Sequence, residues 1–231
     1  MQNLALKNLS DNKKRFFAEV IGTFFVVVCA TGSVVINAHS GNTIGLWFEA
    51  LAPFVAVASM VFLFGRISMA HFNPSVTLAF LITGHMPARL LSLYLGAEAI
   101  GAFLGSGFVK FVVGSDANLG ANAPNYSYSL PIIIGIEALA TGILISMILF
   151  VIHTKRNRVF SSVAIGSMIF FDIFFLSFIS GASMNPIRSL APAVVSGFVN
   201  DLWLYWSAPF LGAAVIAMIY KRYFAKRIRQ N

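Results

Sequence analysis

Residues 71–77 read His-Phe-Asn-Pro-Ser-Val-Thr, and residues 184–189 read Met-Asn-Pro-Ile-Arg-Ser. Each segment places an Asn-Pro pair inside a strongly hydrophobic stretch of the chain. Asn is a favourable N-cap and Pro suits the first position of a helix. The two segments therefore predict two short helices, at residues 73–83 and 185–196. With about 11 residues each, both helices are too short to cross a bilayer.

A helix that begins inside the apolar layer leaves its first N–H groups without partners, and lipid cannot supply them. The starts of these two helices must therefore line a polar cavity. We interpret them as re-entrant half-helices on the wall of a pore.

The rest of the chain has the composition of a membrane protein. Of its 231 residues, 58% are hydrophobic and only 10% are charged, and the mean hydropathy is +0.82. Soluble domains carry about 25% charged residues. The sequence predicts an all-α membrane protein with six transmembrane helices plus the two re-entrant half-helices, because six apolar runs are each about long enough to cross the bilayer core. These runs are residues 16–37, 44–65, 88–113, 130–152, 159–180 and 202–220.

The net charge of +8 indicates membrane topology, not a nucleic-acid partner. With the N-terminus inside, all of the 16 basic residues except Lys110 and Arg188 fall on the cytoplasmic side. The positive-inside rule then places both termini in the cytoplasm of a multi-pass protein of the cell membrane. The basic residues near the chain ends include Lys7, Lys226, Arg227 and Arg229. The expected partner is the lipid bilayer.

The chain also repeats itself. Three pairs of residues recur at similar offsets: Glu19 with Glu137, Asn73 with Asn185, and Tyr94 with Tyr205. Each half holds three predicted spans, an odd number, so the second half crosses the membrane in the opposite orientation. We expect a single domain, residues 1–231, built from inverted repeat halves at about 1–113 and 130–231. The two Asn-Pro elements then enter from opposite faces and meet near the midplane.

Two such segments in register with an inverted repeat resemble the paired Asn-Pro-Ala signatures of the aquaporin (major intrinsic protein) family. The resemblance extends over essentially the whole chain and implies a homotetramer with one pore per subunit. We expect neither a cofactor nor a metal, and no enzymatic activity, because the sequence lacks clusters with catalytic or ligand spacing. The motif residues are Asn73, Pro74, Ser75, Asn185, Pro186 and Ile187, with Ser75 and Ile187 in place of the alanines.

The resemblance also implies roles for individual side chains. Asn73 and Asn185 would offer N–H donors to a passing solute. Glu19, Glu137 and His71 would hold the re-entrant loops through hydrogen bonds with their backbone. Buried carboxylates in lipid are costly without partners, which independently favours this supporting role for the two acids.

A positive barrier would lie at the centre of the pore. Each half-helix N-terminus carries roughly +0.5 elementary charge, and Arg188 adds a full charge three positions after Asn185. Aquaporin-type pores exclude protons and cations with such an arrangement. A neutral solute that can form hydrogen bonds would cross.

The selectivity filter is where the chain departs from the family pattern. Counted from the two motifs without gaps, the filter is Pro53, Ile173, Ala182 and Arg188. A shift of one residue would place Phe54 there instead of Pro53. Strict water channels have His at the Ile173 position, so this ring is expected to be wider and less polar.

Other positions argue against a dedicated glycerol facilitator: Ser189, Ala193, Tyr205 and Trp206. We expect a passive channel for water and other small neutral solutes such as ammonia, hydrogen peroxide or neutral metalloid hydroxides. The alternatives are a glycerol- or urea-type facilitator and, from a different class, an ion-coupled secondary transporter. A coupled transporter needs ionisable residues at the midplane, where this chain has Asn.

Two further residues lead to specific hypotheses. Asp172 lies well inside the fifth span, where it is either a polar wall of the extracellular vestibule or a buried structural acid. Cys29 is the only cysteine. In many family members mercury acts at a filter cysteine, a position that is Ala182 here, so we expect weak mercury sensitivity.

Overall fold

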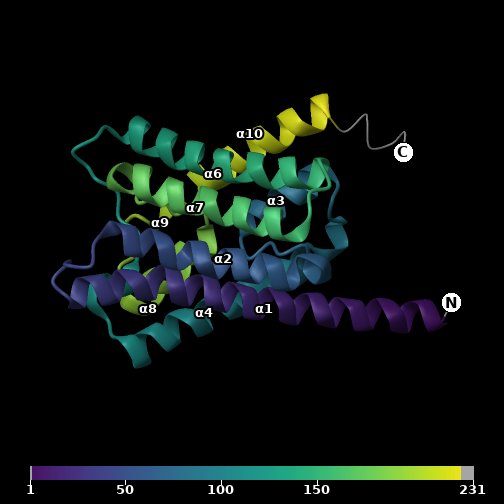
Figure 1. Ribbon diagram of the computed structural model, residues 1–231, viewed down its shortest axis with the longest axis horizontal. Coiled ribbons are helices and arrows are strands. Elements are labelled where there is room, and N and C mark those ends of the chain that lie inside the picture. Colours follow the sequence, from purple (N-terminus) through teal and green to yellow (C-terminus); the bar gives the residue numbers. More distant parts are fainter. Residues whose placement is uncertain (1, 225–231) are drawn as a thin grey trace.

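The computed structural model describes residues 2–224, with side chains from Ser10 onward. The terminal basic residues Lys7, Lys226, Arg227 and Arg229, used in the topology argument, lie outside the residues whose side chains are described. All regular secondary structure in the described chain is helical, and this part of the chain contains no β-strand, as Figure 1 shows.

The helices follow one another in this order: α1 (Gln2–His39), α2 (Leu46–Ser68), α3 (Pro74–Thr83), the 3-10 turn η1 (Ala88–Leu90), α4 (Leu91–Phe108), the π-helical turn η2 (Val109–Val113), α5 (Asp116–Gly120), α6 (Leu130–His153), α7 (Arg158–Ser180), α8 (Pro186–Ser196), α9 (Leu202–Tyr205) and α10 (Ala208–Tyr223). Six helical segments of the described chain are long and apolar enough to cross a membrane. The predicted all-α fold with six spans is confirmed. Between these spans lie the short helices α3 and α8, of 10 and 11 residues.

Two of the six spans are less regular than the sequence predicted. The third span consists of η1, α4 and η2 in succession, and the sixth is divided into α9 and α10. The break in the sixth span has a local cause. Pro209 lacks the N–H that would bond to the carbonyl of Tyr205, so the helical hydrogen-bond ladder is interrupted there.

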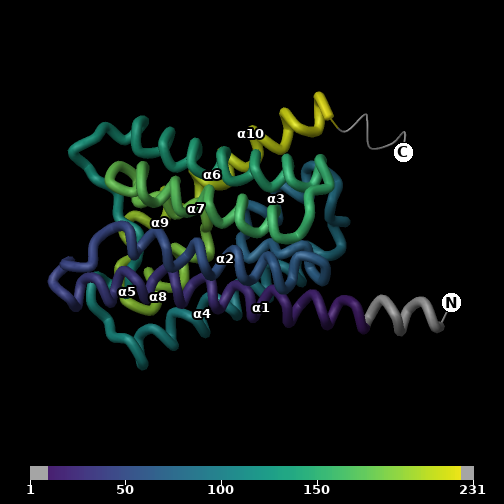
Figure 2. Tube along the Cα trace, in the orientation of Figure 1, coloured from purple at the N-terminus to yellow at the C-terminus, as the bar shows by residue number. Residues whose placement is uncertain are grey.

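The helices pack as two equivalent sets of three. In one half α1 packs on α4, in the other α6 packs on α10, and contact between α2 and α7 joins the halves. The half-helices are exchanged between the sets, because α3 packs on α10 and α8 packs on α4. The tube in Figure 2 shows α3 and α8 displaced toward opposite ends of the bundle. The start of α1 and the end of α10 lie at the same end in Figure 1.

Two glycines allow the closest crossings. A Cβ added at Gly101 of α4 would lie 2.4 Å from the carbonyl oxygen of Val20, and one added at Gly212 of α10 would lie 2.1 Å from that of Ala138. The backbones of α1 and α4, and of α6 and α10, are therefore in direct contact, which is common where small residues line membrane helices.

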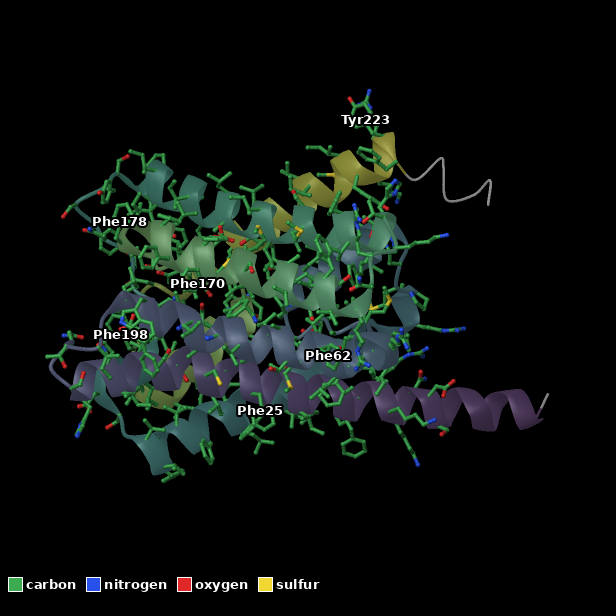
Figure 3. All side chains as sticks on the ribbon, viewed as in Figure 1. Phe25, Phe62, Phe170, Phe178, Phe198 and Tyr223 are labelled. Carbon is green, nitrogen blue, oxygen red and sulfur yellow. The ribbon has the colours of Figure 1, made fainter. Side chains whose placement is uncertain are left out.

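The outside of the bundle is apolar. Figure 3 labels Phe25, Phe62 and Phe178 on this surface, and 44%, 39% and 54% of these residues are exposed. Soluble monomers rarely expose contiguous apolar patches of this kind. The exterior is matched to hydrocarbon, as expected for a multi-pass membrane protein.

Candidate functional site

Asn73 and Asn185 determine where the two half-helices begin. The side-chain oxygen of Asn73 accepts a hydrogen bond from the N–H of Ser75 at 2.8 Å. That of Asn185 accepts from the N–H groups of Ile187 and Arg188, at 3.2 and 3.4 Å. Each Asn is thus an N-cap, and the proline that follows it occupies the first helical turn.

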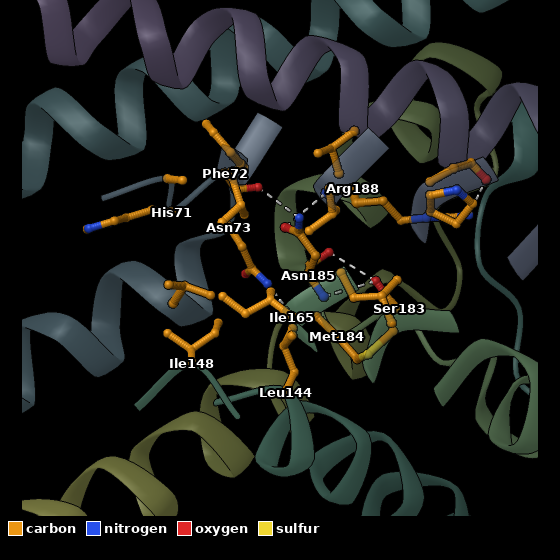
Figure 4. Close-up of a pocket in the computed structure, with 18 of the residues that line it drawn as sticks. His71, Phe72, Asn73, Leu144, Ile148, Ile165, Ser183, Met184, Asn185 and Arg188 are labelled. Atoms are coloured by element: carbon orange, nitrogen blue, oxygen red, sulfur yellow. Dashed lines mark hydrogen bonds between the residues drawn. The ribbon is translucent and has the colours of Figure 1, made fainter. Parts of the chain in front are cut away.

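The same two side chains connect the loops that precede the half-helices. The Nδ2 of Asn73 donates to the carbonyl of Met184, and the Nδ2 of Asn185 donates to the carbonyl of Phe72, both at 2.9 Å (Figure 4). An amide nitrogen carries two hydrogens. Among the residues that the structure describes, each Asn therefore retains one amide hydrogen without a protein acceptor, and both residues line the same cavity.

Glu19 of α1 supports the loop before α3. Its carboxylate is fully buried and accepts hydrogen bonds from the backbone N–H groups of His71 at 3.0 Å and Phe72 at 2.7 Å. Ala70 and Phe72 have positive φ angles of 52° and 50°. Such conformations cost about 1–3 kcal/mol each and persist only when the surroundings enforce them. The carboxylate of Glu19 contributes to that enforcement.

Glu137 of α6 has the equivalent place in the second half. It is also fully buried. Its carboxylate accepts from the backbone N–H groups of Ser183 at 3.2 Å and Met184 at 2.7 Å, and from the hydroxyl of Ser180 at 2.9 Å. Here too the loop has positive φ angles, at Ala182 and Met184. The repeated acids of the sequence thus make repeated contacts.

His71 makes a different contact from the expected one to the loop backbone. Its Nδ1 lies 2.7 Å from the hydroxyl of Thr77 in α3, and Thr77 donates its own hydrogen to Glu98 of α4 at 2.6 Å. With Thr77 donating to Glu98 the Nδ1 is the donor of the first bond, whereas a protonated Glu98 would reverse the direction of both bonds. Sequence reasoning missed Glu98 because the repeat places Pro209, not an acid, at its counterpart.

The cavity has a volume of about 750 Å³ and runs along the whole of α2. It is lined by Glu49 near the start of that helix, by Arg66 near its end, and by Asn73 and Asn185. Figure 4 shows the two asparagines facing each other at its centre.

All four expected filter residues line this cavity: Pro53, Ile173, Ala182 and Arg188. Phe54 is not among the lining residues. Its ring packs instead on Phe170 of α7, with the ring centroids 6.5 Å apart. Of the two alternatives for this position, Pro53 faces the cavity.

Arg188 is held by three acceptors. Its Nη1 donates to the carbonyl of Gly120 at 2.9 Å and to the Oδ1 of Asn122, and its Nη2 donates to the carbonyl of Ala30 at 3.1 Å. A guanidinium has five N–H donors. Within the described residues, the Nε hydrogen and one Nη2 hydrogen therefore have no protein acceptor, and Arg188 lines the cavity.

Sequence analysis also missed Asn122. Its Oδ1 accepts from Arg188 and from the hydroxyl of Ser189, and its Nδ2 donates to the carbonyl of Gly181 at 3.0 Å. The residue belongs to a connection rich in Asn and Ser, and sequence alone does not show which of them folds back onto the filter.

The other motif residues are buried away from the cavity. Ser75 and Ile187 are absent from its lining, and Ile187 packs in an apolar cluster with Val27, Ala102 and Ala191. These two departures from the motif therefore leave the cavity wall unchanged.

Asp172 is buried, with 3% of the residue exposed, and it does not line the cavity. The structure therefore does not support the hypothesis that Asp172 forms part of the wall of the extracellular vestibule. We expect Asp172→Asn to leave permeability to both water and glycerol unchanged in stopped-flow measurements on vesicles. A selective change in one of the two would restore the vestibule hypothesis.

Cys29 of α1 is partly exposed and also lies off the cavity wall. Mercuric ions are therefore expected to reduce water permeability only weakly. The comparison is the initial shrinking rate of vesicles with and without mercuric chloride. Strong inhibition that disappears in Cys29→Ser would contradict this prediction.

A bundle of six membrane helices with two half-helices that meet in one elongated cavity is the architecture of a membrane channel. A family model described as "Major intrinsic protein" matches residues 6–220. The chain belongs to the major intrinsic protein family.

Its curated relatives include aquaporins of plants. It is 34% identical over 225 residues to Aquaporin NIP1-1 of Zea mays, covering 94% of this chain and 78% of the relative. It is also 34% identical over 227 residues to Probable aquaporin NIP4-2 of Arabidopsis thaliana, covering 94% and 77%. Among solved structures, the aquaglyceroporin from Plasmodium falciparum has the same fold, with a TM-score of 0.81 at 22% identity and coverage of 95% of this chain and 100% of that one.

Proposed function

We propose that this protein is a passive channel for water and other small neutral solutes, and that it excludes protons and ions. The observation that carries the proposal is the pair Asn73 and Asn185, each with one free N–H, in a cavity that also contains the charge of Arg188. A cavity lined by residues from the start to the end of α2 fits passive conduction better than the alternating access of a coupled transporter.

Ion exclusion follows from the charges near the centre. The N-termini of α3 and α8 each contribute roughly +0.5 elementary charge, and Arg188 lies in the first turn of α8. A cation that sheds water in this region meets positive potential from both half-helices. A neutral solute meets no such electrostatic barrier, and it gains hydrogen bonds from the cavity wall.

Proton exclusion follows from the direction of those hydrogen bonds. When both asparagines donate to one water oxygen, the two hydrogens of that water point away from them, toward opposite ends of the cavity. A proton wire needs each water to accept from one neighbour and donate to the next. The central water cannot do so while Asn73 and Asn185 occupy its oxygen.

The range of solutes depends on the filter. Pro53, Ile173 and Ala182 offer no polar side chain, so the ring selects weakly against partly apolar molecules. We therefore include ammonia, hydrogen peroxide and neutral metalloid hydroxides among the solutes. The apolar ring also favours the second candidate, a glycerol- or urea-type facilitator, and the names of the relatives and of the structural neighbour support channels of both kinds.

We further propose a single-domain subunit of two inverted halves that assembles as a homotetramer in the cell membrane, with both termini cytoplasmic. The exchanged packing of α3 and α8 supports the inverted halves. The shared end of α1 and α10 in Figure 1 and the distribution of basic residues support the topology. The exposed aromatic surface of α7 supports burial against lipid or another subunit.

The test is stopped-flow light scattering on vesicles that contain the purified protein. We expect faster shrinkage than in protein-free vesicles after a hyperosmotic step, and no ion current in planar bilayers under the same conditions. If neither water nor any small neutral solute moves faster, or if the protein conducts ions, the proposal is wrong.

A further inference from the structure

Glu49 has no role in the function described so far. It lies on α2 one helical turn before Pro53, and it is the only carboxylate on the cavity wall in the part of the chain that the structure describes. Arg188 lines the same cavity, and so does Pro53. The outer part of the cavity thus has one positive and one negative side chain.

Asn37 of α1 holds the Glu49 carboxylate in one orientation. Only 4% of Asn37 is exposed, and its Nδ2 donates to the Oε1 of Glu49 at 2.6 Å. Its Oδ1 accepts from the backbone N–H of Gly45 at 2.9 Å, so the amide cannot turn over without losing both bonds. Within the described structure, the Oε2 of Glu49 receives no protein hydrogen bond, which leaves it available to a solute.

Most other acceptors around Arg188 are already in use. The carbonyls of Gly120 and Ala30 and the Oδ1 of Asn122 all receive hydrogens from its guanidinium. Arg188 retains two free N–H donors, and Glu49 retains one charged acceptor oxygen. The cavity therefore offers a solute both a charged donor, Arg188, and a charged acceptor, Glu49.

We propose that Glu49 is a specificity-determining residue that favours small neutral solutes with two or more hydroxyl groups. Arg188 donates to the oxygen of one hydroxyl while Glu49 accepts the hydrogen of another. A solute with a single polar group can use only one of the two. This inference rests on the proposed channel function and deepens it, because it names the solute chemistry that the outer cavity prefers.

The substitution Glu49→Gln tests this role with little change of shape. The Nδ2 of Asn37 can only donate, so the introduced amide must direct its oxygen toward Asn37. Its NH₂ group then faces the solute side. The variant replaces an acceptor in the cavity by a donor while it keeps the contact with Asn37.

The measurement is the ratio of glycerol permeability to water permeability in vesicles, with glycerol as the polyhydroxyl probe. A hydrogen bond to a charged group is worth enough to lower this ratio about tenfold in Glu49→Gln. Glu49→Asp keeps a charged acceptor but loses the reach to Asn37, so its ratio should remain closer to that of the wild type. If Glu49 only held Asn37 in place, Glu49→Asp would instead lower the ratio more than Glu49→Gln.

The matched control is Asp116→Asn. Asp116 contacts His39 at 3.0 Å at the same end of the bundle but does not line the cavity, so we expect its ratio to equal that of the wild type.

Three results would overturn the inference. These are an unchanged ratio in Glu49→Gln, an equal fall in Asp116→Asn, and a wild type that conducts water but no glycerol. A wild type that conducts nothing would instead refute the proposed function itself.

Discussion

Replacing Glu137 by glutamine is expected to lower the free energy of unfolding by about 3 kcal/mol, because hydrogen bonds to charged groups contribute about 1.5–3 kcal/mol each and a buried unpaired donor adds its own cost. The carboxylate accepts from the backbone N–H groups of Ser183 and Met184, one on each oxygen. In either orientation, the glutamine amide would place its own NH₂ group against the backbone N–H of Ser183 or that of Met184. The loop that carries Ala182 into the cavity would lose its support, so water permeability should fall steeply.

Thermal unfolding in detergent and stopped-flow permeability per amount of inserted protein measure the two effects of Glu137→Gln. Ser180→Ala is the comparison variant, because it leaves both backbone donors to the carboxylate in place while it removes one hydroxyl donor to that carboxylate and the acceptor of the Ala182 N–H. Its destabilisation should be smaller than that of Glu137→Gln, about 2 kcal/mol, because one hydrogen bond to the carboxylate is lost and the buried N–H of Ala182 is left without its acceptor. A glutamine variant as stable and as permeable as the wild type would show that the carboxylate does not support this loop.

Replacing Ile173 by histidine is expected to cut glycerol permeability by about tenfold or more while water still passes. Ile173 lines the cavity with Pro53 and Ala182, so this wall of the filter has no polar side chain opposite Arg188. An imidazole there would narrow the ring and add a group that favours small hydrogen-bonding solutes. Sites that bind through hydrogen bonds discriminate far more strongly than apolar ones.

Permeabilities to water, glycerol, urea and ammonia in the same vesicles give the selectivity of Ile173→His. Ile173→Met is the control, because methionine keeps the apolar character and nearly the same volume. We expect its selectivity to match that of the wild type. Equal glycerol permeability in all three proteins would mean that Ile173 does not limit passage.

The sequence predicted the parts of the site that local rules determine. The Asn-Pro pairs indicated both half-helix starts, since capping and the fixed φ of proline act within a few residues. The six spans followed from the length and hydropathy of the apolar runs. The recurrence of Glu19 as Glu137 identified two acids whose contacts also recur, since an inverted repeat places equivalent residues in equivalent surroundings.

The remaining parts depend on contacts between distant segments. Glu98 and Asn122 have no counterpart in the other half and no motif of their own, so only the folded chain shows that they contact Thr77 and Arg188. The filter position was ambiguous for a similar reason. Phe54 lies against Gly166 of α7, where an added Cβ would come within 2.9 Å of its ring, and this close fit turns Pro53 toward the cavity.

The exchanged half-helices have a consequence for biogenesis. Because α3 packs on α10, it acquires that partner only after the last span has been synthesised. When the first half of the chain enters the membrane, the carbonyl of Met184 that accepts a hydrogen bond from Asn73 has therefore not yet been synthesised. It lies 111 residues further along the chain. Insertion of the first half into the membrane therefore precedes closure of the pore. Neither half alone contains the partners that its own half-helix needs.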